Sequence, residues 1–121
     1  MINLKKIKEY CFKKPGTFED FPFDQSTLTF KIVNKMYALA NIDSQPLRIN
    51  LKCDPHLSLD LRQKYEQVIP GYHMNKKHWN TIIIDGVIPD KEIFNLIDLS
   101  YNLVFISLKK TERDEILTFN R

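Results

Sequence analysis

"TLTFKIVNKMYALANIDSQPLRINLK", residues 27–52, is the stretch that decides the fold class. It contains three runs rich in β-branched and aromatic residues, which predict strands over 27–33, 36–42 and 47–52. The residues between these runs, Asn34-Lys35 and Asp43–Pro46, are of the kinds that form tight turns. Three consecutive strands joined by such short turns indicate an antiparallel meander.

A helical pattern precedes the meander. Leu4, Ile7 and Cys11 recur at helical spacing, and Pro15-Gly16 ends the short amphipathic helix that they predict. Residues 17–26 show neither period, so we interpret them as an irregular segment whose three phenylalanines tuck against the core.

Two further helices and two extended pieces follow the meander. Asp54-Pro55 has the capping residue and the proline that begin a helix, and Pro89-Asp90 opens a longer helix to about Leu108. The inner positions of the two helices are Leu57, Leu61 and Tyr65 in the first, and Ile93, Ile97, Tyr101, Val104 and Leu108 in the second. The extended pieces are expected over 68–72 and 79–84.

The resulting order, α-β-β-β-α-β-β-α, predicts an α+β fold in which helices pack on one face of an antiparallel sheet. We expect a single domain over 1–121, with residues 109–121 either extending the last helix or forming an extra C-terminal tail. The side chains expected to be buried are Leu28, Phe30, Ile49, Leu51, Trp79, Ile83, Ile97, Tyr101 and Val104.

Composition narrows the class of protein. The 121 residues are 43% hydrophobic and 27% charged, and no apolar run approaches the roughly 18 residues that span a membrane. The N-terminal stretch lacks the apolar region of a signal peptide, and the two cysteines, Cys11 and Cys53, form no CxxC pair. We therefore expect a cytoplasmic protein, monomeric, with reduced thiols.

Basic residues are unevenly distributed. The net charge is only +3, but residues 1–14 carry five lysines and one glutamate. A second basic stretch, residues 31–53, contains one acid, Asp43, and the cations Lys31, Lys35, Arg48 and Lys52. Such segregation gives a molecule with one basic face, which suits nucleic acid or an acidic protein partner.

"GYHMNKKHWNTI", residues 71–82, is the densest cluster of unusual side chains. His73 and His78 have a workable spacing for a zinc pair, but no third and fourth ligands lie nearby, so no metal site is predicted. Cys53, with Asp54 and His56, could be a nucleophile with a base, but Asp54 is better explained as a helix cap. The sequence therefore predicts no enzyme and no cofactor.

Two interpretations of this cluster remain open together. In the first, Trp79 begins a strand and packs into the core, while Asn75 and Asn80 hydrogen-bond the backbone of the loop itself. In the second, the same loop displays Lys76 and Lys77 to phosphate oxygens, with its amide and histidine side chains near base edges.

Several stretches together resemble the YjbR/MmcQ family: "FPFD" at 21–24, "KMYAL" at 35–39, "NLKCDP" at 50–55, "GYHMNKKHWNTI" at 71–82 and "DLSYNLV" at 98–104. The resemblance spans residues 1 to about 108. It implies a CyaY-like fold, no established enzyme activity and a proposed DNA-binding "double wing". Frataxins share that fold and bind iron through an acidic first helix, but the first helix here is cationic, so iron binding does not transfer.

The resulting hypothesis is a DNA-binding protein that contacts phosphates through basic hairpin loops. The expected DNA-binding residues are Lys35, Arg48, Lys52, Asn75, Lys76, Lys77 and His78. The alternative is a non-enzymatic module with a basic face that binds an acidic protein or a small ligand. Neither hypothesis involves a membrane.

Overall fold

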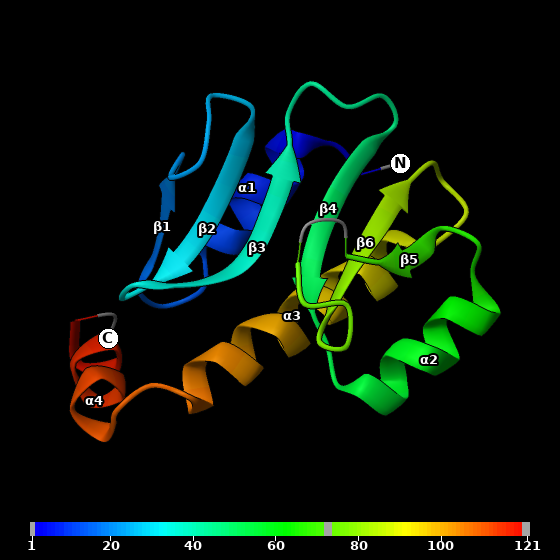
Figure 1. The fold of residues 1–121 in the computed structure, drawn as a ribbon. Helices are drawn as coiled ribbons and strands as arrows, with labels where there is room; N and C mark the ends of the chain where they lie inside the picture. Colours follow the sequence, from blue (N-terminus) through cyan, green and yellow to red (C-terminus); the bar gives the residue numbers. More distant parts are fainter. Residues whose placement is uncertain (1, 72–73, 120–121) are drawn as a thin grey trace.

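Six strands form one antiparallel sheet in the computed structural model, which describes residues 2–71 and 74–119 (Figure 1). The strands are β1 (Thr17–Asp20), β2 (Thr27–Ile32), β3 (Lys35–Asn41), β4 (Leu47–Lys52), β5 (Val68–Pro70) and β6 (Trp79–Ile84). They lie in the order β1-β2-β3-β4-β6-β5. The helices are α1 (Leu4–Phe12), α2 (Pro55–Lys64), α3 (Asp90–Ile106) and α4 (Lys110–Phe119). The predicted α+β class is confirmed.

The core lies between the sheet and the helices α1 and α3, which cover one face of it (Figure 1). Alternation along β2 and β4 turns Phe30, Ile49 and Leu51 toward these helices, and Ile97 and Val104 of α3 meet them. Of the nine side chains predicted to be buried, all except Ile83 are buried. Ile83 is half-buried, because Ile82 and Ile84 take the positions facing the core and alternation turns Ile83 outward.

The segment predicted to be irregular, residues 17–26, contains the edge strand β1. Phe18 lies opposite Lys31 on the outer face of the sheet, the face away from α1 and α3. The expectation that the three phenylalanines tuck against the core is therefore wrong. Phe18, Phe21 and Phe23 are 41%, 44% and 63% exposed.

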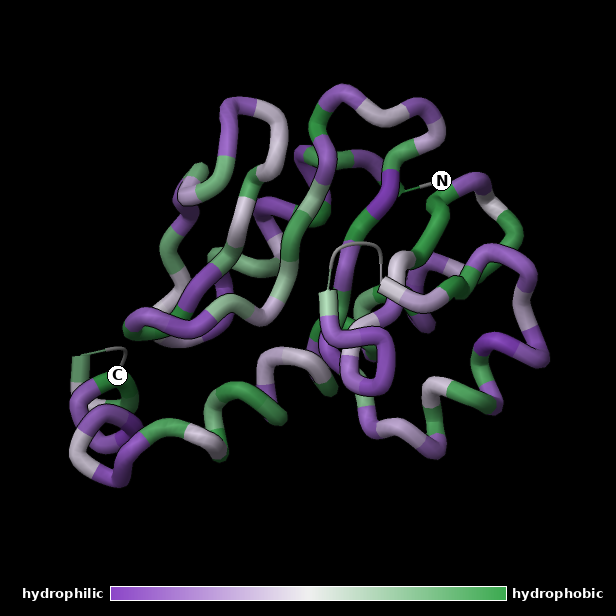
Figure 2. The backbone as a smooth tube through the Cα atoms, viewed as in Figure 1, coloured by the Kyte–Doolittle hydropathy of each residue, from purple (hydrophilic) through white to green (hydrophobic). Residues whose placement is uncertain are grey.

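The turn between β2 and β3 is one residue earlier than predicted. Ile32 pairs with Lys35, so the two turn residues are Val33 and Asn34 and Lys35 begins β3. Val33 has a φ of 58°, in the left-handed region that a β-branched residue rarely adopts. Hydrophilic residues predominate in the 74–78 loop (Figure 2).

Residues 110–119 form a helix of their own, α4, and do not extend α3. α3 ends at Ile106, and the Lys109 amide then donates to the Glu112 carboxylate (3.0 Å), which begins α4. α4 packs on Gly16, where a Cβ atom would lie 3.1 Å from the Ile116 side chain. Among the described residues, no helix is long and apolar enough to cross a membrane.

A side-chain hydroxyl group takes the place of a backbone hydrogen bond where β3 and β4 separate. Their ladder runs from Asn41–Arg48 to Ala38–Leu51 and stops there. At the next position Ser100 of α3 donates its hydroxyl to the Tyr37 carbonyl (2.5 Å) and accepts the Lys52 amide (2.9 Å). Ser100 is fully buried, so it satisfies two backbone groups that the two strands no longer satisfy for each other.

Tyr37 is also the extra residue of a bulge between β2 and β3. Phe30 pairs with Ala38 and Lys31 with Met36, which leaves Tyr37 without a partner in β2. A bulge increases the local twist of a strand, and this one lies at the point where the β3–β4 ladder ends.

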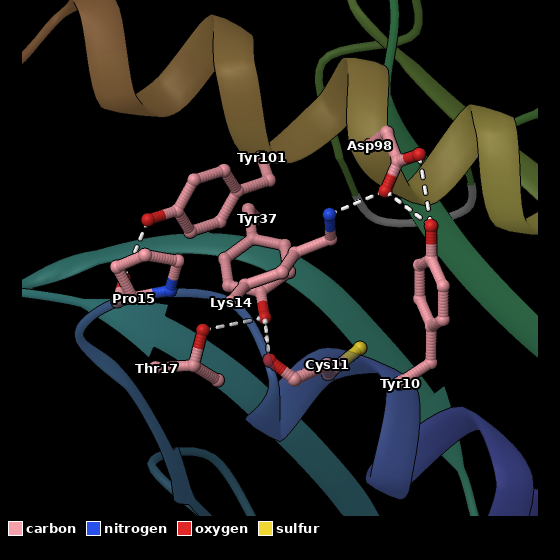
Figure 3. Close-up of polar contacts among 8 residues, drawn as sticks. All are labelled: Tyr10, Cys11, Lys14, Pro15, Thr17, Tyr37, Asp98 and Tyr101. Carbon is pink, nitrogen blue, oxygen red and sulfur yellow. Dashed lines mark hydrogen bonds and ion pairs between the residues drawn. The ribbon is translucent and has the colours of Figure 1, made fainter. Parts of the chain in front are cut away.

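A polar cluster joins α1 to α3 (Figure 3). The Tyr10 hydroxyl donates to both carboxylate oxygens of Asp98 (2.7 and 2.9 Å), and the Lys14 ammonium forms an ion pair with the same carboxylate. Lys14 also lies over the rings of Tyr10 and Tyr101, with Nζ 5.0 and 5.3 Å from their centroids. The Tyr101 hydroxyl donates to the Pro15 carbonyl at 2.5 Å. These contacts fix α1 and the following turn against α3.

Burial keeps several acidic groups of this cluster protonated. Burial, assisted by the hydrogen bond to Asp98, raises the pKa of Tyr10 to about 12. Burial also raises the pKa of Tyr101 and of the Cys11 thiol to about 12, and that of Tyr37 further still. Each pKa is higher in the folded chain than the usual value of 9.0 or 10.0, so the folded chain retains protons that the unfolded chain loses in alkali.

Replacement of Ser100 by alanine removes the bridge and leaves a buried carbonyl and a buried amide unsatisfied. We expect Ser100→Ala to lower the free energy of unfolding by about 1–3 kcal/mol, measured by urea titration. Asn102→Ala, an exposed change on the same helix, is the control and should stay within about 0.5 kcal/mol of the parent. Equal stability of the two variants would show that the bridge is dispensable.

Stability should fall as the pH rises from 9 toward 12. The stabilisation from the raised pKa values is complete below the usual values of 9.0 and 10.0 and is lost as the folded groups titrate near 12. Urea titrations at successive pH values measure the effect. Tyr10→Phe removes one of these protons and should make the decline less steep; a decline of unchanged slope would contradict the assignment.

Candidate nucleic-acid interface

Two loops and the end of a central strand meet at one end of the sheet. Ile32 pairs with Lys35, and Lys52, the last residue of β4, pairs with Trp79, the first residue of β6. The β2–β3 turn, the end of β4 and the loop before β6 therefore lie at the same end (Figure 1). Four lysines on these segments define what we name the lysine edge: Lys35, Lys52, Lys76 and Lys77.

Lys35 is held at the C-terminal end of α3. Its ammonium group donates to the carbonyl and the hydroxyl oxygen of Ser107, both at 3.2 Å. The carbonyl groups at a helix C-terminus carry partial negative charge, so they stabilise a cation there. Lys35 remains exposed, and its position is therefore defined without its charge being buried.

The loop that carries Lys76 and Lys77 is closed by Asn75. The Asn75 side-chain oxygen accepts the Lys77 amide proton at 3.0 Å, and its backbone carbonyl accepts those of His78 (3.1 Å) and Trp79 (2.9 Å). This geometry confirms the prediction that Asn75 serves the backbone of the loop. It also engages one lone pair of the Asn75 oxygen, so that oxygen keeps one acceptor position toward a ligand, beside the donors of the amino group.

Arg62 of α2 braces the same loop, and sequence analysis did not single it out. Its guanidinium donates to the Lys76 carbonyl (2.6 Å) and to the side-chain oxygen of Asn80 (2.8 Å). Asn80 in turn donates to the Ser58 hydroxyl (3.0 Å). The prediction that Asn80 bonds the loop backbone is therefore wrong, because alternation along β6 turns it inward to α2. Ser58 and Arg62 are four residues apart, so they lie on one face of the helix. This spacing is the sequence signal that could have indicated their shared contact with Asn80.

Trp79 begins β6 and is buried, as predicted. It is 9% exposed, and its carbonyl accepts the Gly71 amide at 2.9 Å. A Cβ atom on Gly71 would lie 2.9 Å from that of Trp79, so the close approach of the two strands requires glycine at this position.

The other predicted site residues are distributed differently. Arg48 lies opposite Asn41 and Ile83, four residues along β4 from Lys52, which is roughly 13 Å toward the opposite end of the sheet. His78 is half-buried beside the lysine edge, and its carbonyl accepts the Cys53 amide at 2.7 Å. The structure thus gathers Lys35, Lys52 and residues 75–78, and it leaves Arg48 apart.

The considered metal and catalytic residues do not assemble within the described residues. His73 lies outside them, and among the remainder no cluster of three or more His, Cys, Asp or Glu side chains could hold a metal ion. Asp54 caps α2, accepting the amides of His56 (3.0 Å) and Leu57 (3.1 Å), as predicted. Cys53 is buried, and burial raises the pKa of its thiol, which disfavours the thiolate needed for attack.

The lysine edge carries positive charge that no neighbouring acid neutralises. Within residues 2–71 and 74–119, the ion pairs are Lys8–Glu19, Lys14–Asp98 and Lys31–Asp20. None of them includes a member of the edge. Four ammonium groups at one end of the sheet thus remain available to a polyanion.

Comparisons with known proteins agree with the fold. The family model described as YjbR matches residues 12–103. The uncharacterised protein YjbR of Escherichia coli K12 is 31% identical over 117 residues, covering 96% of this chain and 98% of its own length. YyaQ of Bacillus subtilis is 33% identical over 117 residues, covering 85% and 98%. The resemblance found in the sequence is confirmed.

Solved structures extend the agreement to the backbone. The crystal structure of Deinococcus radiodurans protein DR2400 has a TM-score of 0.90 at 41% identity, covering 96% of this chain and 88% of that one. A Pseudomonas syringae protein has a TM-score of 0.72 at 33% identity, covering 84% and 98%. The six-stranded antiparallel sheet and its helices are therefore an established architecture.

Loss of the Arg62 brace should loosen the loop. Arg62→Ala removes the donors to a buried amide oxygen and to a loop carbonyl, so we expect a loss of about 1–3 kcal/mol in unfolding free energy. Hydrogen exchange at the amides of residues 77–79 should accelerate. Lys64→Ala removes the same charge from the same helix at a position that does not contact the loop. It should neither lower the unfolding free energy by that amount nor accelerate the exchange. Unchanged exchange in Arg62→Ala would contradict the bracing role.

Proposed function

This chain belongs to the YjbR family, and from that starting point we propose that it binds nucleic acid without enzymatic activity, holding the phosphates of duplex DNA on its lysine edge. The observation that carries the proposal is the gathering of four ammonium groups from separate segments at one end of the sheet, none of which forms an ion pair with a described residue. A polyanion is the partner whose affinity such a set increases most. A cytoplasmic location and a monomeric state belong to the same proposal.

The spacing of the two loops suits a double helix. β3 and β6 lie on either side of β4, so the loops at their ends are at least roughly 10 Å apart. The major groove of B-DNA is about 12 Å wide, with a phosphate backbone on each side. Lys35 would meet one backbone and Lys76 and Lys77 the other, with Lys52 between them. Arg48 is too far along β4 to join these contacts.

The same geometry predicts weak sequence preference. Adenine is recognised by an asparagine that both donates and accepts, and the bond from the Lys77 amide to the Asn75 oxygen restricts how this side chain can turn toward a base. His78 is half-buried. In this proposal both side chains provide at most single contacts to base edges, and phosphate contacts provide most of the affinity.

The salt dependence of binding tests the proposal. If four cations neutralise phosphates, the logarithm of affinity should fall with the logarithm of salt concentration at a slope of about −3 to −4. Lys76→Ala with Lys77→Ala should flatten that slope by about 2 and weaken binding to all sequences alike. Fluorescence anisotropy with a labelled duplex measures both. Arg48→Ala, an exposed cation away from the edge, should leave the slope unchanged.

An acidic protein or a small anionic ligand is the competing partner. Salt dependence does not separate it from DNA, since screening weakens both complexes. Parallel titrations with polyglutamate and with the duplex do distinguish the two kinds of partner. Equal affinity for the two polymers, or no duplex binding at roughly 100 µM protein, would reject DNA as the partner in favour of a protein- or ligand-binding module.

A further inference from the structure

A cavity opens beside the β2–β3 turn, where β3 and β4 part. Below the Ala38–Leu51 pair the strands separate, and α3 passes behind the gap, bridged by Ser100 (Figure 1). The cavity measures about 480 Å³, within the roughly 300–1,000 Å³ of small-molecule sites. We name this cavity the notch. Its lining includes Phe23, Lys31, Lys35, Met36, Lys52 and Ser107.

The lining combines two chemistries. Lys31, Lys35 and Lys52 bring three ammonium groups, from three different strands. Lys31 is partly engaged, 3.6 Å from the Asp20 carboxylate and 6.0 Å from the Phe18 ring centroid. The other two form no ion pair with any described residue. The notch is therefore an anion site with a net positive lining.

Aromatic and thioether side chains provide the second chemistry. Phe23 lines the notch and is 63% exposed, and Met36 lies in the same lining. An exposed aromatic ring beside lysines is the combination that binds nucleotides, since the ring stacks on a base while the ammonium groups hold its phosphate. In a perfect duplex the faces of the bases are covered by their neighbours, so Phe23 would have nothing to stack on.

We propose that the notch binds one unpaired nucleotide of a nucleic-acid strand, with its base on Phe23 and Met36 and its phosphate at Lys31, Lys35 and Lys52. The inference rests on the proposed function and refines it, because two members of the lysine edge line the notch. The preferred target is then a duplex containing an unpaired nucleotide, such as a bulge, a flap or a junction with a single strand. A free nucleoside monophosphate has the same chemistry, and the test below separates the two sources.

Three labelled probes of one sequence test the inference by fluorescence anisotropy: a perfect duplex, the duplex with a single-nucleotide bulge, and the same bulge without its base. We expect the bulged duplex to bind about tenfold tighter than the perfect duplex, which is the effect of one stacked base. The abasic bulge, which keeps the phosphate and the flexibility, should lose most of that gain. Free adenosine monophosphate should not displace the bulged probe at concentrations comparable to the protein.

Variants assign the gain to the ring. Phe23→Ala should abolish the preference for the bulge and leave perfect-duplex affinity unchanged, and Phe23→Leu, which keeps apolar bulk without a ring, should do the same. Phe21→Ala, an exposed phenylalanine of the same loop that does not line the notch, is the matched control and should retain the preference.

The outcomes separate this inference from the proposed function. Salt-dependent binding of the duplex with no preference for the bulge, or a preference that survives Phe23→Ala, would overturn the notch assignment and leave the phosphate-binding edge intact. Displacement by stoichiometric adenosine monophosphate would identify the notch as a free-nucleotide site and overturn the nucleic-acid assignment. Binding of none of the three probes would overturn both proposals.

Discussion

The Ser100 hydroxyl determines the shape of this molecule, because it stands where a sheet hydrogen bond would otherwise lie. One buried oxygen satisfies the Tyr37 carbonyl and the Lys52 amide, so β3 and β4 can separate without leaving a buried polar group unpaired. The bulge at Tyr37 adds local twist to β3 at the same position. The sheet thereby splits at one end into two arms that share α3 as their support, and the notch lies at that split.

Much of the fold could be predicted from local patterns. Alternation of apolar residues is a direct consequence of the pleat, so β2, β4 and β6 were located to within a residue or two. The spacing of Ile93, Ile97 and Tyr101 similarly identified the buried face of α3. The cap at Asp54 depends on its immediate neighbours alone. Among the candidate site residues, Lys76 and Lys77 stand out in the sequence because they are adjacent lysines in a polar loop.

The remainder depends on contacts between distant residues. β1 has only four residues, and it forms a strand because it pairs with the free edge of β2. No pattern within residues 17–20 indicates that pairing. The Arg62 brace joins residues 14 and 18 positions apart, and its partners became evident only when α2 and β6 were placed together. Arg48 lies apart from the lysines because it pairs with Asn41, near the other end of β4 and β3. Its closeness to Lys35 and Lys52 in the sequence had suggested that it would lie beside them.

Val33, at the tip of the β2–β3 hairpin, has a consequence for the order in which this protein folds. A β-branched residue in the left-handed region costs about 1–2 kcal/mol, so the turn is a poor place for the two strands to begin pairing. Pairing is favoured instead at the far end of the hairpin, by the pairs Thr27–Asn41 and Leu28–Ala40. It is also favoured by the side chains that enter the core, which are Phe30, Ile32 and Tyr37. The hairpin should therefore close from its open end toward its tip, only after α1 and α3 have collapsed onto it. Formation of this arm is then a late, tertiary event, and the cationic end of the sheet is completed with the last step of folding.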